Sequence, residues 1–293
     1  MTPTFLRPTS RSQKRKALDK AFTIFCAFAA IIAVSILFVL IGKVLMDGLA
    51  RVSPQFIKSM PSQMFPDKAG ILSPLVGSLY VMALTVLFVV PVGIAAAVYL
   101  EEFTPKKTPF VRFIQVNIAN LAGVPSIVYG MLGLTLFVSV MGLGKSVLTG
   151  ALTMSILVLP MVILVTQEAL KAVPKYYRES SLALGTTQWQ TIRRIVLPTA
   201  LPGILTGIIL SASRAIGETA PLIVVGAVGF VTFLPTGLDS RYTVLPLQIL
   251  YWIGQPKPEF RTAAAAAIIV LSDMILILNS AAIIIRARAQ KKL

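Results

Sequence analysis

Six long runs of apolar residues dominate this 293-residue sequence and restrict the chain to folds that cross a lipid bilayer. The runs lie at about 21–46, 71–100, 118–141, 147–166, 200–233 and 262–285. Each is long enough to cross roughly 30 Å of hydrocarbon as an α-helix. Because 56% of the residues are hydrophobic and only 13% are charged, a soluble domain is excluded. We therefore expect an all-α membrane protein with about six transmembrane helices.

The segments between these runs divide the chain into recognisable parts. We expect a basic N-terminal tail at 1–20, a first transmembrane helix at 21–46 and a domain of five further spans at 71–285. A short C-terminal tail follows at 286–293. The segment 167–199 forms a long polar loop between the fourth and fifth spans, and it carries the most specific pattern in the sequence.

The basic residues predict the orientation of the chain in the membrane. If the N-terminus is inside, 18 of the 27 Lys and Arg residues lie in inside segments, 8 lie in outside segments, and Arg214 lies within a span. By the positive-inside rule both termini are then cytoplasmic. The same distribution explains the net charge of +16 through topology, so we expect no nucleic-acid partner.

Several kinds of chemistry are missing from the sequence. It contains one cysteine, Cys26, and no histidine, which excludes an intrachain disulfide and His-based metal or acid–base sites. The stretch 142–146 ends in Gly-Lys-Ser like a phosphate-binding loop, but position 139 is Ser where that loop requires Gly. We expect no metal, cofactor or nucleotide site in this chain, and a membrane enzyme is disfavoured.

The loop at 167–199 predicts two short helices that lie on the cytoplasmic face. The first carries small residues and ends at Gly185, where a left-handed C-cap is favourable. The second, Gln188 to Val196, is amphipathic, with Trp189, Ile192 and Ile195 on one side, and Pro198 can open the next span. Such a hairpin either docks into a groove on a partner or rests at the membrane interface.

This loop resembles the Glu-Ala-Ala-x3-Gly-x9-Ile-x-Leu-Pro signature of permease subunits of bacterial ATP-binding-cassette (ABC) importers. The fixed positions are filled by Glu179, Ser180, Ser181, Gly185, Ile195, Leu197 and Pro198, with the two serines in place of the alanines. The resemblance implies a type I importer (MetI-like) permease fold. It also implies that the loop couples to a separate ATPase, which binds the ATP and Mg that this chain does not hold.

Apart from the boundary residue Lys43, three charged residues fall within the predicted spans: Arg214, Glu218 and Asp273. Charge in hydrocarbon requires a partner or a water-filled path. Arg214 and Glu218 are i and i+4 on a helix, so they form either a self-neutralising pair that holds the bundle together or part of a translocation path. On a path, the guanidinium would hold an oxyanion. For Asp273, which lies near Ser272 and Asn279, we expect a hydrogen-bonded packing role.

Small residues continue the Arg214 face at a spacing of four: Gly203, Gly207, Ser211 and Ala215. This stripe permits close helix packing. Pro125 interrupts the third span, and an interrupted helix either lines a polar path or forms a packing kink. Trp252, Tyr242 and Tyr251 are expected at the outer membrane–water interface.

Three local strings, at 123–130, 213–221 and 260–264, resemble permeases of the phosphate-specific ABC importer, and the A-type subunit more than the C-type. The resemblance implies a heterodimer with a C-type permease, two cytosolic ATPase subunits and an extracytoplasmic phosphate-binding protein, in a bacterial cytoplasmic (inner) membrane. It associates Arg214 and Glu218 with phosphate passage. Two alternatives stay open: transport of another oxyanion, such as molybdate, sulfate or phosphonate, and an ion-coupled secondary transporter that needs no ATPase.

Overall fold

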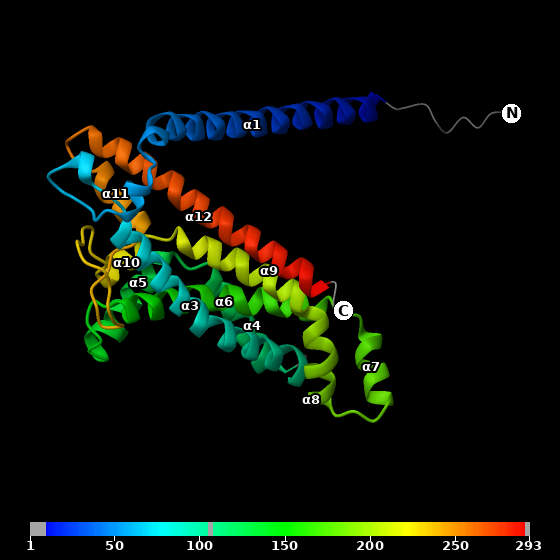
Figure 1. The fold of residues 1–293 in the computed structure, drawn as a ribbon. Coiled ribbons are helices and arrows are strands. Elements are labelled where there is room, and N and C mark those ends of the chain that lie inside the picture. Colours follow the sequence, from blue (N-terminus) through cyan, green and yellow to red (C-terminus); the bar gives the residue numbers. More distant parts are fainter. Residues whose placement is uncertain (1–9, 105–107, 291–293) are drawn as a thin grey trace.

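The computed structural model describes residues 10–104 and 108–290, which are almost entirely helical (Figure 1). The α-helices are α1 (Ser10–Gly48), α2 (Pro54–Lys58), α3 (Leu72–Val98), α4 (Pro109–Ala122), α5 (Ser126–Gly133), α6 (Val147–Lys171), α7 (Lys175–Ala183), α8 (Gln188–Thr191), α9 (Leu197–Ile216), α10 (Ala220–Val225), α11 (Leu245–Ile253) and α12 (Glu259–Gln290). The predicted all-α class is confirmed. The predicted tails overlap α1 and α12, and residues 1–9, 105–107 and 291–293, with their basic residues, lie outside the described part.

Five helical runs are long and apolar enough to cross a membrane, and a bent pair brings the number to six. The five contain α1, α3, α6, α9 and α12. The sixth consists of α4 followed by Ser126–Val140, which meet at an angle of 101°. The predicted span at 118–141 is therefore two half-length helices rather than one straight helix, because the chain breaks at Pro125.

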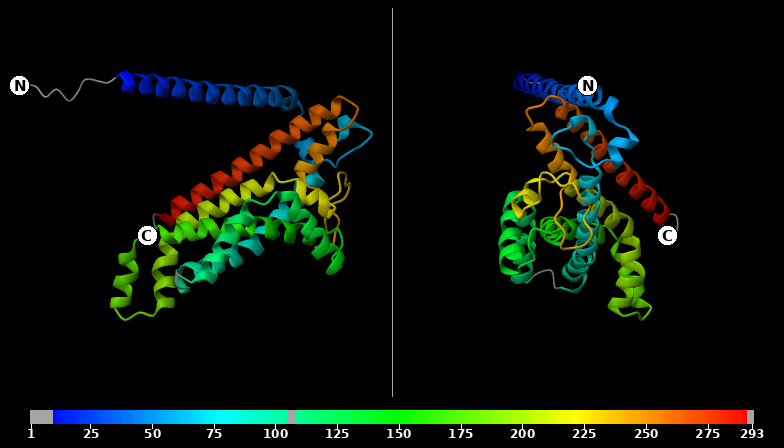
Figure 2. Two further views of the ribbon diagram at one scale, coloured as in Figure 1. Left: turned by 180° about the vertical axis from the view of Figure 1, so that it is seen from behind. Right: turned by 60° about the vertical axis from the view of Figure 1, so that its left-hand side comes forward.

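The bundle has two distinct ends (Figures 1 and 2). The hairpin formed by α7 and α8 projects from the same end as the C-terminus, which we call the hairpin end. Helices α5, α10 and α11 lie at the opposite, far end. The end of helix α1 contacts the start of α12 at the far end, and the rest of α1 points away from the bundle. No residue in the most apolar 18-residue stretch of α1 is buried.

Small residues bring the central helices together. A Cβ on Gly93 of α3 would lie 2.7 Å from the Val162 side chain of α6. On the other side of α6, a Cβ on Gly207 of α9 would lie 2.5 Å from Val165. The predicted packing role of the small-residue stripe on α9 is thus confirmed, because a larger residue at 207 would force α6 and α9 apart.

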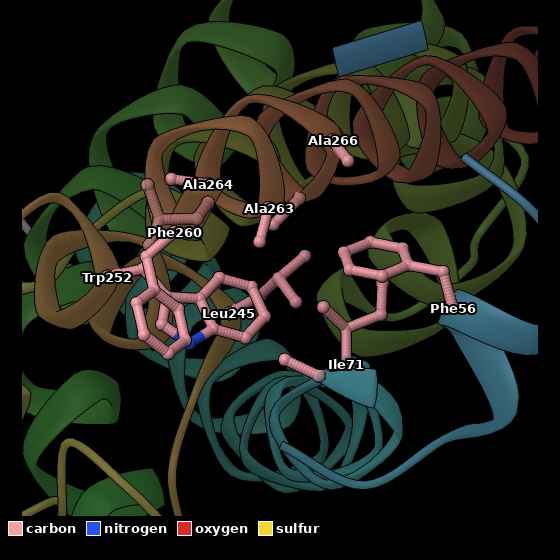
Figure 3. Close-up of a cluster of buried hydrophobic side chains, with 11 residues drawn as sticks. Phe56, Ile71, Leu245, Trp252, Phe260, Ala263, Ala264 and Ala266 are labelled. Atoms are coloured by element: carbon pink, nitrogen blue, oxygen red, sulfur yellow. The ribbon is translucent and has the colours of Figure 1, made fainter. Parts of the chain in front are cut away.

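Buried side chains form three clusters along the bundle. The cluster at the far end joins α2, the start of α3, α11 and the start of α12 (Figure 3). A middle cluster joins α3, α6 and α9, and the third lies among α3, α6 and α9 at the hairpin end. The second and third clusters hold α6 between α3 and α9, where it supports the candidate site.

Two of the aromatic residues expected at the outer interface are buried instead. Trp252 lies in the far-end cluster with its ring centroid 6.2 Å from that of Phe56 (Figure 3). Tyr242 packs into space left by Gly150 of α6. Both rings therefore serve the core of the far end and are not exposed there, whereas their position relative to the membrane surface stays a prediction.

The fifth predicted span, 200–233, differs from the structure at both ends. Helix α9 ends at Ile216, and the chain beyond it forms the short α10 and an irregular loop. At its start, α9 continues α8 through a π-helical turn, Ile192–Val196, so Pro198 does not open the helix as expected. The Leu197 N–H bonds to the Ile192 carbonyl five residues back. This wider turn precedes Pro198, whose ring would clash with the carbonyl of a regular α-turn.

Asp273 is exposed on α12 and has no hydrogen bond or ion pair with any other residue in the described ranges. The expected packing role therefore fails for Asp273 within this chain. Asn279, which lies further along α12, accepts a hydrogen bond from the Ser213 hydroxyl of α9. The sequence placed both polar residues in the last span but could not decide which of them faces α9.

Candidate functional site

A cavity of about 270 Å³ lies where the α4–α5 break meets the end of α9. One wall is the break itself, including Gly123 and Ser126. Met161 of α6 and Ser211 of α9 form further walls, and Arg214 and Glu218 both line the cavity. The structure therefore brings the two predicted path residues to the predicted interruption of the third span.

The break between α4 and α5 has a local cause in the sequence. Pro125 has no N–H and disfavours helical conformation in the residue before it, so α4 ends at Ala122. The Tyr129 hydroxyl reaches back across the break and donates to the Leu121 carbonyl at 2.7 Å. The Leu121 carbonyl also accepts from the Val124 N–H at 3.1 Å, so the bond from Tyr129 is a second one to the end of α4, and it links the two half-helices in their bent arrangement.

The first turn of α5 adds a positive environment to the cavity. Helix N-termini expose backbone N–H groups and carry partial positive charge. Pro125 and Ser126 at the start of α5 line the same cavity as Arg214. Neutral donors and a guanidinium thus converge on one space inside the bundle, an arrangement suited to a small anion.

Arg214 and Glu218 form a loose pair. The Arg214 Nε lies 3.9 Å from Glu218 Oε1, which is an ion pair without a short hydrogen bond. The Arg214 side chain is 61% exposed and that of Glu218 is 21% exposed. Arg214 Nη1 also approaches the Met161 sulfur at 3.7 Å. The guanidinium therefore keeps donors that are open to the cavity.

The geometry of this pair differs from the expected i, i+4 arrangement on one helix. Helix α9 ends at Ile216, and Gly217 caps it. Glu218 lies beyond the cap, with its N–H bonded to the Ala215 carbonyl at 3.1 Å. Arg214 thus occupies the last turn of α9, where a cation complements the helix dipole.

The segments at 123–130 and 213–221 build this region, whereas the segment at 260–264 does not. A Cβ on Gly130 would lie 2.8 Å from the Pro221 Cα, so the strings at 123–130 and 213–221 pack directly against each other. Phe260, Ala263 and Ala264 lie instead in the buried cluster at the far end (Figure 3). Their role in the fold is packing.

The hairpin forms a second candidate site, and its first helix ends as the sequence predicts. Helix α7 ends at Ala183, and Gly185 has a φ of +81°, which is the left-handed conformation expected of a C-cap glycine. Glu179 and Ser180 are exposed on α7. A capping box formed by Thr187 and Gln190 starts α8.

Ser181 lies inside the hairpin rather than on its outer surface. Its hydroxyl is 2.7 Å from that of Thr186 and 2.9 Å from that of Thr191, and the two threonine hydroxyls are 2.9 Å apart. This three-hydroxyl cluster joins α7 to α8. The sequence grouped Ser181 with Ser180 as small docking residues, but the structure separates them.

The remaining signature residues lie along the helix that leaves the hairpin. Ile195, Leu197 and Pro198 are half-buried. Ile192 is buried, whereas Trp189 is 55% exposed although its ring lies 6.4 Å from that of Phe103. The predicted apolar side of this helix is therefore divided between the bundle core and the surface.

Sequence reasoning missed an ion pair at the base of the hairpin. Arg178 Nη2 lies 2.6 Å from Glu102 Oε1, whereas the sequence showed Arg178 only as one of the basic residues of the loop at 167–199. A signal was present, since two adjacent carboxylates, Glu101 and Glu102, follow directly after an apolar run. Among the described residues, no group of three His, Cys, Asp or Glu side chains is placed to hold a metal ion.

Comparison with known families gives a match over most of the bundle. Residues 89–291 match the family described as "Binding-protein-dependent transport system inner membrane component". A Bacillus subtilis protein named "Probable ABC transporter permease protein YqgI" is 37% identical over 71% of this chain and 70% of its own length. The Mycobacterium leprae "Phosphate transport system permease protein PstA" is 35% identical over 86% of this chain and 82% of its own.

Solved structures share the fold at lower sequence identity. A chain of the methionine ABC transporter MetNI, in an inward-facing conformation, superposes with a TM-score of 0.60 at 19% identity, covering 73% of this chain and 94% of that one. A chain of a bacterial ABC transporter involved in alginate import gives a TM-score of 0.59 at 18% identity, covering 94% and 99%. The helical arrangement is thus shared with known importer subunits.

Proposed function

Because the chain belongs to the family of binding-protein-dependent transport system inner membrane components, we propose that it is the permease subunit of an ABC importer through which inorganic phosphate passes at Arg214. Relatives at 34–35% identity that carry the name of phosphate permeases support the choice of phosphate. The choice of Arg214 is supported by its position on the wall of the cavity. The proposed path depends on this one observation.

Arg214 suits a transient anion site better than a permanent structural pair. A guanidinium offers a planar set of donors that matches the oxygens of phosphate. At 3.9 Å, Glu218 engages it weakly enough for an anion to compete. Glu218 also limits how tightly the anion binds, because a nearby negative charge opposes it, and this favours release.

The hairpin at 167–199 is the proposed contact with the ATPase. Glu179, Ser180 and Gly185 present an exposed face on the first helix and its end. Ser181 holds this face to the second helix from inside, and Ile195, Leu197 and Pro198 carry the continuous helix from the hairpin to Arg214. The ATP and Mg would be bound by the ATPase.

The proposed assembly contains a C-type permease as heterodimer partner, two cytosolic ATPase subunits and an extracytoplasmic phosphate-binding protein. The complex would lie in a bacterial inner membrane with both termini in the cytoplasm. The exposed apolar surface of α1 agrees with a chain that is surrounded by lipid and partner helices. The family sets the general architecture, and the subunit identities are part of the proposal.

The path is tested by Arg214→Ala in the complete complex, reconstituted in vesicles with phosphate-loaded binding protein and ATP. We expect radiolabelled phosphate uptake to fall at least about tenfold, since a charge-assisted hydrogen bond is worth roughly 1.5–3 kcal/mol. Assembly with the ATPase should be unchanged. Arg112→Ala, which removes an exposed cation from α4, is the matched control and should retain uptake.

Three results would reject parts of this proposal. If Arg214→Ala prevents the subunits from assembling, Arg214 holds the bundle together and does not mark the path. If unlabelled sulfate or molybdate suppresses uptake as well as unlabelled phosphate does, the substrate is a different oxyanion or a broader class. Accumulation of phosphate by the chain without any ATPase would favour an ion-coupled transporter instead.

A further inference from the structure

The hairpin is attached to the rest of the bundle by Arg178, a residue outside the importer signature. Arg178 Nε lies 3.2 Å from both carboxylate oxygens of Glu102, and Nη2 lies 2.6 Å from one of them. The same guanidinium donates to the Leu170 and Val173 carbonyls at 2.8 Å each. Glu102 lies in the π-helical turn Tyr99–Phe103 that continues α3. One side chain on α7 therefore binds the continuation of α3 and the end of α6 together.

Burial makes this attachment stiffer than an ordinary surface ion pair. The Glu102 side chain is 9% exposed and that of Arg178 is 21% exposed. Multidentate contacts between a guanidinium and a carboxylate fix the relative orientation of the two groups as well as their separation. The two carbonyls lie at the C-terminal end of α6, where a cation also complements the helix dipole.

The second half of the hairpin reaches the same point on α3. The Gln188 side chain donates to the backbone carbonyl of Glu102, and Trp189 lies against Phe103 with ring centroids 6.4 Å apart. The hydroxyl cluster of Ser181, Thr186 and Thr191 joins the two halves internally. The hairpin is thus attached at both of its helices and has little freedom to turn against α3 and α6.

Helix α6 connects this attachment to the cavity. Leu170, whose carbonyl Arg178 binds, lies nine residues after Met161, or roughly 13 Å along a helix at about 1.5 Å per residue. Met161 lines the cavity and touches Arg214. A displacement of the hairpin that α6 follows rigidly would therefore move a wall of the proposed phosphate path.

We propose that Arg178 is a positioning residue for transport, which makes the hairpin, α3 and α6 move as one body when the ATPase displaces the hairpin. This inference rests on the proposed function, since it assumes that an ATPase binds the hairpin. Arg178 touches neither the substrate nor the proposed docking face. Without Arg178, the ATPase should still hydrolyse ATP and the cavity should still form, but hydrolysis should no longer move the cavity wall.

The experiment compares Arg178→Gln with wild type in the complete complex with phosphate-loaded binding protein, and measures the ATP hydrolysed per phosphate imported. We expect the complex to assemble and the ratio to rise at least about tenfold, because hydrolysis continues while import fails. Lys175→Gln removes an exposed cation from the same helix one turn earlier and should keep the wild-type ratio.

Glu102→Gln removes the same bond from the side of α3 and provides the second variant. It should also raise the ratio, and the double variant should be no worse than Arg178→Gln, because that variant already removes the ion pair together with the bonds to the Leu170 and Val173 carbonyls. A ratio that stays at the wild-type value, or failure of both single variants to assemble, overturns the proposal. If the wild-type complex itself does not import phosphate, it is the proposed function that fails.

Discussion

Ser181 shows how a single residue of the hairpin can serve packing rather than docking. Its hydroxyl is one of three that bond to each other between α7 and α8. Removal of this hydroxyl leaves Thr186 and Thr191 bonded at 2.9 Å, so no buried hydroxyl loses its last partner. The cluster is therefore tolerant of a small residue at position 181 and intolerant of a large one.

We expect Ser181→Ala to lower the free energy of unfolding by no more than about 1 kcal/mol, the net value of a typical hydrogen bond. Ser181→Leu should cost more and should also weaken ATPase binding, because the larger side chain must separate α7 from α8. Thermal unfolding of the purified complex and co-purification of the ATPase measure the two effects. Ser180→Leu, on the exposed face, is the control for stability and should leave thermal unfolding unchanged.

Gly150 leaves the space that the ring of Tyr242 fills. A Cβ at this position would lie 2.1 Å from the Tyr242 hydroxyl oxygen. We expect Gly150→Ala to destabilise the bundle by about 1–3 kcal/mol through overpacking. Gly42→Ala adds the same methyl group to α1, where nothing lies within 4 Å, and should be neutral. Equal unfolding temperatures for the two variants would contradict this account of the contact.

Burial also raises the pKa of the Tyr242 hydroxyl. The unfolded chain then releases this proton at a lower pH than the folded chain does, so the stability present below the ordinary tyrosine pKa of about 10 is lost as pH rises beyond it. Because the Tyr242 hydroxyl has no hydrogen-bond partner in the part of the chain that the structure describes, Tyr242→Phe should remove this pH dependence at little cost in stability. Thermal unfolding between neutral and alkaline pH measures the difference.

At the level of residues, the sequence predicted chemistry better than contacts. Arg214 and Glu218 stand out because charge is rare in apolar runs, and the structure brings both to one cavity. Ser181 and Asp273 were misjudged because helical spacing shows which residues share a face but not what that face meets. Arg178 was missed because its partner, Glu102, lies 76 residues away in the chain.

Among the elements, the hairpin depends on the left-handed conformation of Gly185. No atom lies within 4 Å of a Cβ built on this glycine, so a substitution there would act through the backbone alone. We expect Gly185→Ala to cost about 1–2 kcal/mol and to lower binding-protein-stimulated ATP hydrolysis, because α7 would end at a different angle. Gly185→Asn should be milder, since Asn tolerates this conformation. If both variants behaved alike, the backbone would not be the cause.

Helix ends were the least predictable part of the elements. The existence of each span follows from apolar length, which the bilayer requires. The end of α9 at Ile216 was missed although Gly217 and Pro221 mark it, because the apolar run continues to residue 233 and was taken as one span. Pro125 correctly indicated a break, whereas Pro198 lies within a continuous helix that absorbs it through a π-helical turn.

For the whole molecule, the positive-inside rule makes a prediction that labelling can test. In a Cys26→Ser background, Lys145→Cys places a thiol at the far end and Leu184→Cys places one at the hairpin tip, and both positions are exposed. A membrane-impermeant maleimide added to intact cells should label position 145 alone. Position 184 should react after the cells are permeabilised. The reverse pattern would place the termini outside.

The contact between α1 and α12 has a consequence for how the chain is made. Gly48 at the end of α1 leaves no room for a Cβ against the backbone of Ala265 in α12. Because α1 precedes α12 by most of the bundle in the chain, it must wait until α12 has been synthesised before this contact can form. Until α12 enters the bilayer, the contact at Gly48 does not hold α1 to the bundle.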